Sequence, residues 1–140
     1  MEKPCVFCAI VRHEKPADRV YEDARVCAFL DASPLFKGHV LVVPKAHVLA
    51  LEDLPAEEVE PLFATVRALT SAVRRGLGAD GSFVAMNNVV SQSVPHLHAH
   101  VIPRRHGDGL KHFFWPREKY ASDEERHDYA ARIRAAMDVG

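Results

Sequence analysis

The run His96–Ile102 constrains the fold of this chain more than any other stretch. Histidine occupies positions 96, 98 and 100, and the positions between them are apolar (Leu97, Ala99 and Val101). Strict alternation is typical of a β-strand that packs one face on the core and presents the other. Imidazoles suit nucleophilic and proton-transfer chemistry near neutral pH and are common metal ligands. The run therefore predicts a strand with three imidazoles on one open face, at an active site, a metal site or both.

Length and charge exclude several classes of protein. With 140 residues, 48% of them hydrophobic and 26% charged, the chain fits one soluble globular domain with its own core. A formal net charge of −1 gives no field that draws it to nucleic acid or to an anionic membrane, so we expect neither partner. No apolar run reaches membrane-spanning length, the start resembles no signal peptide, and three cysteines cannot all pair. We expect a cytoplasmic protein.

Hydrophobic periodicity predicts five strands and two helices. Apolar or alternating runs between turn residues predict strands at 20–22, 26–30, 39–43, 82–86 and 96–102. A helix is expected to start with Asp53 as its N-cap and to end at Gly76 and Gly78, with one apolar face formed by Val59, Leu62, Phe63, Val66, Leu69 and Val73. A capping box at Ser122–Glu125 predicts a last helix, which carries on one face Tyr129, Ile133 and Met137.

The pair Cys5 and Cys8 has the spacing of a zinc knuckle or of a redox pair. Two cysteines supply only half of a tetrahedral metal site, and the chain has no second pair at this spacing. A metal would therefore need further ligands from His, Asp or Glu; otherwise the two are free or buried thiols. Cys27 lies inside a strand-like run, which favours core packing.

Two further segments each allow two interpretations. The polar loop Asn87–Ser93 leads into the triple-histidine run, where its side chains could orient a ligand or stabilise a turn. The aromatic cluster Phe113–Pro116 lies among the cations Lys111, Arg117 and Lys119. It could cover the core at its C-terminal end, or it could stack on a base or contact a second subunit.

With these pieces placed, the sequence resembles the histidine triad (HIT) family, in the branch of the nucleoside phosphoramidate hydrolases. Three blocks between about Cys5 and Arg104 carry the resemblance: Phe29–Asp31, Gly38–His47, and Gln92–Pro103 with its pattern Q-x-V-x-H-x-H-x-H. The resemblance implies an α+β fold, with an antiparallel sheet of about five strands, a long central helix and a C-terminal helix. It implies a single HIT domain over residues 1–140, with the motif block at 5–104 and a C-terminal extension at 105–140, that pairs as a homodimer.

The resemblance also implies a role for each matching residue. His98 matches the nucleophile that attacks the α-phosphorus of a purine nucleotide and forms a nucleotidyl-histidine. His100 matches the residue on the leaving-group side of the scissile phosphate, and His39 matches a supporting neighbour. The substrate-binding positions, for phosphate, bridging oxygen and ribose hydroxyls, are Asp31, Asn87 or Asn88, Gln92 and Ser93. Family members commonly carry glycines before the glutamine, whereas Asn88–Ser91 has none.

Bacterial relatives with this N-terminus bind zinc through four residues, and the resemblance extends that set to this chain. The matching ligands are Cys5, Cys8, His47 and His96. Four ligands of this kind make a closed tetrahedral site, which is structural rather than catalytic. The resemblance implies no organic cofactor.

Three functions remain open. The first is hydrolysis of nucleoside 5′-phosphoramidates or related adenylates, with His98 as nucleophile. The second is hydrolysis of dinucleoside polyphosphates or nucleotidyl transfer, which extra cations such as Lys111, Arg117 and Lys119 would favour. The third is a nucleotide-binding or scaffold role without physiological turnover.

Overall fold

The computed structural model describes residues 4–111 and 116–137. These residues form two units, one up to Asp108 and one from Gly109 onward, and each is described by itself. The predicted aromatic cluster at Phe113, Phe114 and Trp115 lies outside the described residues. Among the described residues, no helix is both long enough and apolar enough to cross a membrane.

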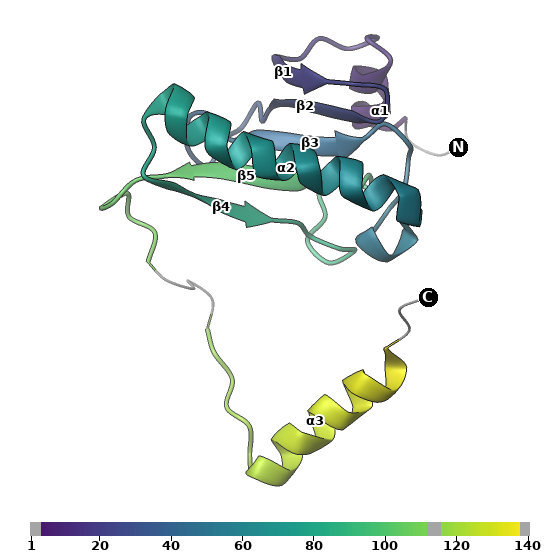
Figure 1. Ribbon diagram of the computed structural model, residues 1–140, viewed down its shortest axis with the longest axis vertical. Helices are drawn as coiled ribbons and strands as arrows, with labels where there is room; N and C mark the ends of the chain where they lie inside the picture. Colours follow the sequence, from purple (N-terminus) through teal and green to yellow (C-terminus); the bar gives the residue numbers. More distant parts are fainter. Residues whose placement is uncertain (1–3, 112–115, 138–140) are drawn as a thin grey trace. The chain divides into compact units, whose positions relative to one another are not determined.

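The first unit is built on one antiparallel sheet (Figure 1). Its strands are β1 (Arg19–Glu22), β2 (Val26–Leu30), β3 (Val40–Pro44), β4 (Gly81–Ala85) and β5 (Ala99–Arg104). Their order across the sheet is β1-β2-β3-β5-β4, and every neighbouring pair is antiparallel. The sheet with its helices confirms the predicted α+β fold of about five strands.

Turn chemistry and burial explain the first three strands. Between β1 and β2, the Asp23 carboxylate accepts hydrogen bonds from the backbone N–H groups of Arg25 (2.7 Å) and Val26 (2.8 Å), which closes the predicted hairpin. Strand β3 is buried along its whole length, as its continuous apolar sequence predicts. Both faces of the sheet are therefore covered at β3.

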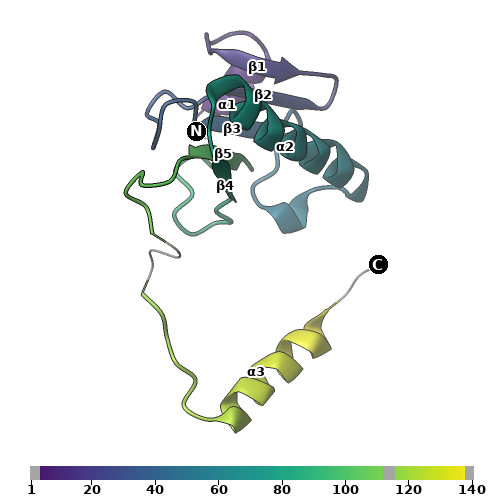
Figure 2. The ribbon, with the colours of Figure 1, turned by 60° about the vertical axis from the view of Figure 1, so that its left-hand side comes forward.

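A separate core cluster covers each face. The long helix α2 (Ala56–Leu77) packs on β2, β3, β4 and β5 and lies across one face (Figures 1 and 2). The short helix α1 (Val6–Val11) contributes the buried side chains of Phe7 and Ile10 to the other cluster. Cys27 belongs to that second cluster and is fully buried, which confirms its predicted role in packing.

Helix α2 departs from its prediction at one end. Asp53 is not its N-cap: it ends a short 3-10 helix, η1 (Leu51–Asp53), and its carboxylate accepts from the Ala50 N–H (3.2 Å). Pro55 occupies the N-cap position of α2 instead. At the other end, Gly78 has a left-handed backbone (φ +68°) and stops the helix, as predicted.

The apolar face of α2 is narrower than predicted. Leu62, Val66, Leu69 and Val73 are buried, but Val59 and Phe63 are 40% and 39% exposed. A helix advances by about 100° per residue, so Phe63 points well away from the line that Leu62 and Val66 form. The width of the buried stripe depends on the surface beneath it, which periodicity alone does not describe.

The second unit contains helix α3 (Asp123–Ala136). The Ser122 hydroxyl accepts from the Glu125 N–H (3.1 Å), and the Glu125 carboxylate accepts from the Ala121 N–H (2.8 Å). This reciprocal capping confirms the predicted start of the helix. The expected apolar face is exposed at all three of its positions, Tyr129, Ile133 and Met137.

Candidate active site and metal site

The triple-histidine run differs from its prediction in two respects. Strand β5 begins only at Ala99, so His96 and His98 precede it, and both are buried, at 0% and 3% exposure. The expected open face is therefore wrong. The Phe7 ring of α1 covers it, lying edge-on to the rings of His96 (5.9 Å between centroids) and His98 (5.0 Å). The alternation itself persists, because the intervening apolar residues pack in the core beneath α2.

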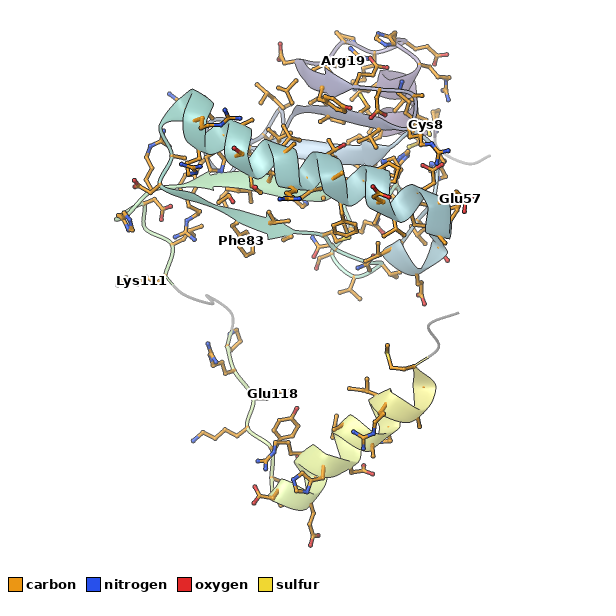
Figure 3. All side chains as sticks on the ribbon, in the orientation of Figure 1. Cys8, Arg19, Glu57, Phe83, Lys111 and Glu118 are labelled. Atoms are coloured by element: carbon orange, nitrogen blue, oxygen red, sulfur yellow. The ribbon has the colours of Figure 1, made fainter. Side chains whose placement is uncertain are left out.

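The structure brings together the four predicted metal ligands. The donor atoms of Cys5, Cys8, His47 and His96 lie within 4.8 Å of one another. Cys8, labelled in Figure 3, lies with its sulfur 3.3 Å from His47 Nδ1 and 3.5 Å from His96 Nδ1. The Cys5 sulfur lies 3.3 Å from His96 Nδ1, and the two imidazole nitrogens are 3.1 Å apart.

This donor set fits a tetrahedral transition-metal ion. Zn–S bonds of about 2.3 Å and Zn–N bonds of about 2.0 Å separate tetrahedral donor atoms by about 3.3–3.8 Å, close to the distances seen here. His96 Nε2 donates to the Pro44 carbonyl (2.8 Å), so the lone pair is on Nδ1, which faces the cluster. Burial and the neighbouring Cys5 raise the pKa of the Cys8 thiol, so a bound cation would be needed to hold it as thiolate at neutral pH.

His98 has its protonation pattern set by the main chain. Its Nδ1 lies 2.7 Å from the carbonyl oxygen of His96, which can only accept a hydrogen bond. Nδ1 therefore carries the proton, and Nε2 of the neutral ring keeps its lone pair. His98 also lines a cavity, so this nitrogen is suited to act as a nucleophile on a bound molecule.

His39 and His100 form a directed chain of hydrogen bonds. The polypeptide backbone turns at Gly38 (φ +94°), and the Leu35 N–H donates a hydrogen bond to His39 Nδ1 (3.1 Å). His39 must therefore carry its proton on Nε2, which lies 2.9 Å from His100 Nδ1. His100 Nδ1 is then an acceptor, so the proton of this ring lies on Nε2. Burial lowers the pKa of His100 to about 4 and also lowers the pKa of His39, so both rings are neutral near pH 7.

Asp31, His39 and His100 also bring three possible metal-ligand atoms together. Asp31 Oδ2 lies 3.8 Å from His39 Nε2. A metal-bound imidazole normally donates its second N–H to an acceptor, as His96 does here. His39 does not follow this pattern, because its Nδ1 accepts a hydrogen bond from the Leu35 N–H. This geometry favours a hydrogen-bond relay over a second metal site.

A cavity of about 620 Å³ lies against these imidazoles. Of the predicted site residues, it is lined by Asp31, Ser93, His98 and His100. His39 is buried and reaches the cavity through His100. The wall also contains residues that the sequence did not single out, among them the apolar Val6, Phe7, Ile10 and Val94 and the cations Lys15 and Lys37. Phe7 and Ile10 lie three positions apart beside the cysteine pair, and this spacing was the sequence signal that could have identified them as site residues.

The remaining predicted residues make loop contacts. The Gln92 amide donates to the Leu49 carbonyl (2.7 Å) and accepts from the Val89 N–H (3.2 Å). Asn88 accepts from the Leu51 N–H (2.7 Å). Neither side chain, nor that of Asn87, lines the cavity. Asn88 and Gln92 therefore hold the loop in place, partly against residues 49–51, whereas Ser93 of the same loop lines the cavity.

A larger hollow of about 830 Å³ lies elsewhere in the first unit. Its walls come from the C-terminal half of α2, with Leu69 and Leu77, and from the sheet, with Val40 and Pro103. The catalytic, substrate-binding and metal-ligand residues predicted from the sequence do not line it. Of these two cavities, the smaller one is the one that predicted site residues line.

Comparison with protein families gives one match, the HIT domain, over residues 12–107. A HIT-like protein of Methanocaldococcus jannaschii is 44% identical over 107 residues, which are 75% of this chain and 82% of that protein. An adenosine 5′-monophosphoramidase of Schizosaccharomyces pombe is 33% identical over 122 residues, which are 86% of this chain and 89% of that protein.

Solved structures show the same fold. A HIT family protein of Bacillus subtilis is 31% identical and aligns with a TM-score of 0.88 over 99% of this chain and 100% of that chain. A zinc-bound histidine triad protein of Mycobacterium smegmatis is 39% identical and aligns with a TM-score of 0.73 over 95% of this chain and 97% of that chain.

Proposed function

Because the chain belongs to the HIT family, we propose that it hydrolyses nucleoside 5′-phosphoramidates or related adenylates at the α-phosphate. The observation that carries the proposal is the arrangement of His98. Its Nδ1–H donates to the His96 carbonyl, and its ring lines the cavity with an Nε2 lone pair available. A nucleophile needs this combination of a fixed tautomer and access to the substrate.

The reaction would proceed in two displacements at phosphorus. In the first, His98 Nε2 forms a bond to the α-phosphorus while the bond from phosphorus to the leaving nitrogen breaks. The nucleotidyl-imidazolium keeps its Nδ1 proton, and the His96 carbonyl stabilises the new positive charge. In the second, water attacks phosphorus and His98 leaves. Overall, water contributes its hydroxyl to the nucleotide and its proton to the released amine.

His100 would assist at the leaving-group side. The relay from Leu35 through His39 leaves His100 with a proton on Nε2, as a hydrogen-bond donor to a phosphoryl oxygen or to the leaving group. Its pKa of about 4 keeps the ring neutral, so its Nδ1 remains an acceptor for His39 at neutral pH. His39 therefore positions His100 rather than touching the substrate.

The cavity wall suits a purine nucleoside. Apolar side chains such as Phe7 and Ile10 offer surface to a base, and Asp31 can accept from ribose hydroxyls. Ser93 lines the wall, and we propose that it contacts the phosphate, the role that the resemblance implies. We propose that Asn88 and Gln92 act by holding the loop before Ser93. A direct phosphate contact would require them to leave Leu51 and Leu49.

We also propose that the ion at Cys5, Cys8, His47 and His96 is zinc, because two thiolates and two imidazoles are ligands that zinc prefers. Zinc bound there would supply a structural link between the N-terminal segment and the sheet. The zinc-bound relative from Mycobacterium smegmatis supports this identity. Elemental analysis of protein purified without added metal should find about one zinc per chain, and much less in a His47→Ala variant.

Two cavity residues favour a second candidate substrate. Lys15 and Lys37 line the wall and could bind additional phosphates, as in a dinucleoside polyphosphate. The same nucleophile would serve that reaction. Replacement of both lysines by methionine should therefore weaken turnover of diadenosine polyphosphates more than turnover of a phosphoramidate.

Rapid mixing with adenosine 5′-monophosphoramidate, followed by intact-protein mass spectrometry, tests the proposal. The wild type should accumulate an adenylyl adduct that His98→Ala lacks. His106→Ala is the matched control, because His106 is exposed and does not line the cavity. An adduct in His98→Ala would overturn the assignment of the nucleophile. Binding of AMP without any adduct or turnover in the wild type would favour a nucleotide-binding role.

A further inference from the structure

Helix α1 belongs to the metal cluster and to the nucleotide cavity at the same time. Its N-cap Cys5 and its own Cys8 supply the two thiols, and Phe7 and Ile10 of the same helix line the cavity wall. The other two cluster residues, His47 and His96, come from the part of the chain that follows β3 and from the segment before β5. The cluster therefore joins the cavity wall to the sheet.

The two sides of the cluster differ in how firmly they are held without a metal. His96 is fully buried and donates to the Pro44 carbonyl, so it stays in place on its own. Helix α1 has only six residues, and isolated helices shorter than about 12 residues are unstable in water. Its position depends on the packing of Phe7 and Ile10 and on the bonds that the thiols make across the cluster.

We propose that Cys5 and Cys8 form a redox-sensitive clamp on the nucleotide cavity. Oxidation of the pair to a disulfide removes both sulfurs from the metal, releases the ion and loosens α1, so that nucleotide binding weakens. The inference rests on the proposed function for the identity of the ligand. It assigns regulation to a cluster that would otherwise serve only as a structural link.

The oxidant is a peroxide, and the step balances. One thiolate sulfur attacks a peroxide oxygen, the O–O bond breaks, and a sulfenic acid and hydroxide form. The second thiolate attacks the sulfenic sulfur, the S–S bond forms, and a second hydroxide leaves. Two protons from solvent convert the hydroxides to water, and the metal leaves as the divalent cation. The two sulfurs lose two electrons in total, and the peroxide gains them.

The structure makes the pair accessible and provides an internal control. Cys5 and Cys8 are partly exposed, and their sulfur atoms lie within 4.8 Å of each other. Cys27 is fully buried in the core on the same face of the sheet. A small oxidant therefore reaches the pair before it reaches Cys27.

The effect of oxidation should fall on substrate binding rather than on the nucleophile. The carbonyl that sets the His98 tautomer belongs to His96, which its bond to the Pro44 carbonyl holds in place, whereas Phe7 leaves the wall together with α1. Stacking of a base on an aromatic side chain contributes enough that its loss should raise the dissociation constant for AMP about tenfold or more.

Calorimetric titration with AMP, before and after treatment with hydrogen peroxide, tests the clamp on the zinc-loaded full chain. Zinc release is followed with a chromogenic chelator, and amide hydrogen exchange is followed over residues 6–11. Peroxide should release zinc, speed exchange in α1 and raise the dissociation constant for AMP. A reductant with added zinc should reverse all three changes.

Two variants sharpen the test. Cys8→His keeps four metal ligands but has no second thiol, so its Cys5 cannot form the disulfide, and peroxide should release less zinc and weaken AMP binding less than in the wild type. Cys27→Ala should respond to peroxide as the wild type does. Zinc release without faster amide exchange in α1 and without weaker AMP binding would overturn the clamp. Equal sensitivity of Cys8→His and the wild type to peroxide would also overturn it. Failure of the reduced protein to bind AMP would contradict the proposed function and not the clamp. In that case, zinc release and amide hydrogen exchange in α1 would still test the clamp.

Discussion

Each of the buried imidazoles has its proton placed by a neighbouring backbone group. The Leu35 N–H makes His39 Nδ1 an acceptor, whereas the carbonyls of His96 and Pro44 require a proton on His98 Nδ1 and on His96 Nε2. These contacts give the rings different donor and acceptor atoms, because the proton lies on Nδ1 in His98 and on Nε2 in His39 and His96. Their residue type and spacing in the sequence do not distinguish them.

The lowered pKa of His100 predicts a defined dependence of stability on pH. An imidazole in the unfolded chain has a pKa of about 6.5, whereas burial lowers the pKa of His100 in the folded chain to about 4. Between these values the unfolded state binds more protons, so the free energy of unfolding should fall as the pH falls from about 6.5 to about 4. Urea unfolding at pH 7 and pH 5 should show a larger loss in the wild type than in His100→Asn. Equal losses would contradict the lowered pKa.

Val89 predicts a gain of stability on substitution. Its φ is +71°, and the Val90 N–H donates to the Asn88 carbonyl (2.8 Å), so the chain makes a tight three-residue turn that is rare for a β-branched residue. Val89→Gly should raise the free energy of unfolding by about 0.5–1 kcal/mol, because relief of strain exceeds the entropy cost of glycine.

The neighbouring Val90 is the matched control for that measurement. Its φ is negative and its side chain is 77% exposed, so a glycine there gains freedom in the unfolded chain without relieving strain. Val90→Gly should lower the midpoint of urea unfolding, whereas Val89→Gly should raise it. Equal shifts in the two variants would show that Val89 is unstrained.

At the scale of elements, helix α2 accommodates a proline without breaking. Pro61 lacks an N–H, so the carbonyl of Glu57, four residues earlier, loses its helical partner. Arg25 replaces it: its guanidinium donates to that carbonyl (3.1 Å) and to the Glu58 carboxylate (3.2 Å). A side chain from the β1–β2 turn thus completes the first turns of the helix.

A double-mutant cycle tests this replacement. In the wild type, Arg25→Ala should lower the free energy of unfolding by about 0.5–1.5 kcal/mol, the net worth of an ordinary hydrogen bond. In a Pro61→Ala background the new N–H takes the Glu57 carbonyl, so the same change should cost less. The Glu58 contact is present in both backgrounds and cancels. Equal costs in urea unfolding would show that Arg25 acts only through Glu58.

At the scale of the whole molecule, the open edge of the sheet supports the expected homodimer. Strand β4 pairs with β5 alone among the described strands, and Val84 on β4 is 43% exposed. The helix that packs on β4 carries the exposed Val59 and Phe63. An unpaired edge beside exposed apolar side chains is a surface that a second copy can cover.

We therefore predict that the edge at β4 mediates association. Val84→Lys should shift the sedimentation coefficient in analytical ultracentrifugation from that of a dimer to that of a monomer. Val20→Lys is the matched control, because Val20 is 47% exposed on β1 at the opposite edge. A monomeric wild type would contradict the dimer, and a monomer produced only by Val20→Lys would place the interface at the other edge.

Local sequence patterns were sufficient to predict most of the strands and helices. The hairpin of β1 and β2, the buried strand β3 and the capped start of α3 follow from turn residues, continuous apolar runs and a capping box. These signals act over a few residues, so they depend little on the rest of the fold. The predicted start of α2 was wrong. Asp53, two positions before Pro55, belongs to η1, because an acidic residue can cap a short 3-10 helix as well as a longer helix.

The sequence by itself determined that the histidines alternate with core residues and that two thiols lie three positions apart. Only the tertiary structure decided what covers the histidines, which nitrogen of each ring carries the proton, and which side chains share the cavity. Alternation defines the sides of a chain segment, but α1 reaches His96 and His98 from about ninety residues away in the sequence. The proton of His96 depends on the Pro44 carbonyl, 52 residues away. Such contacts arise only when the whole sheet has formed.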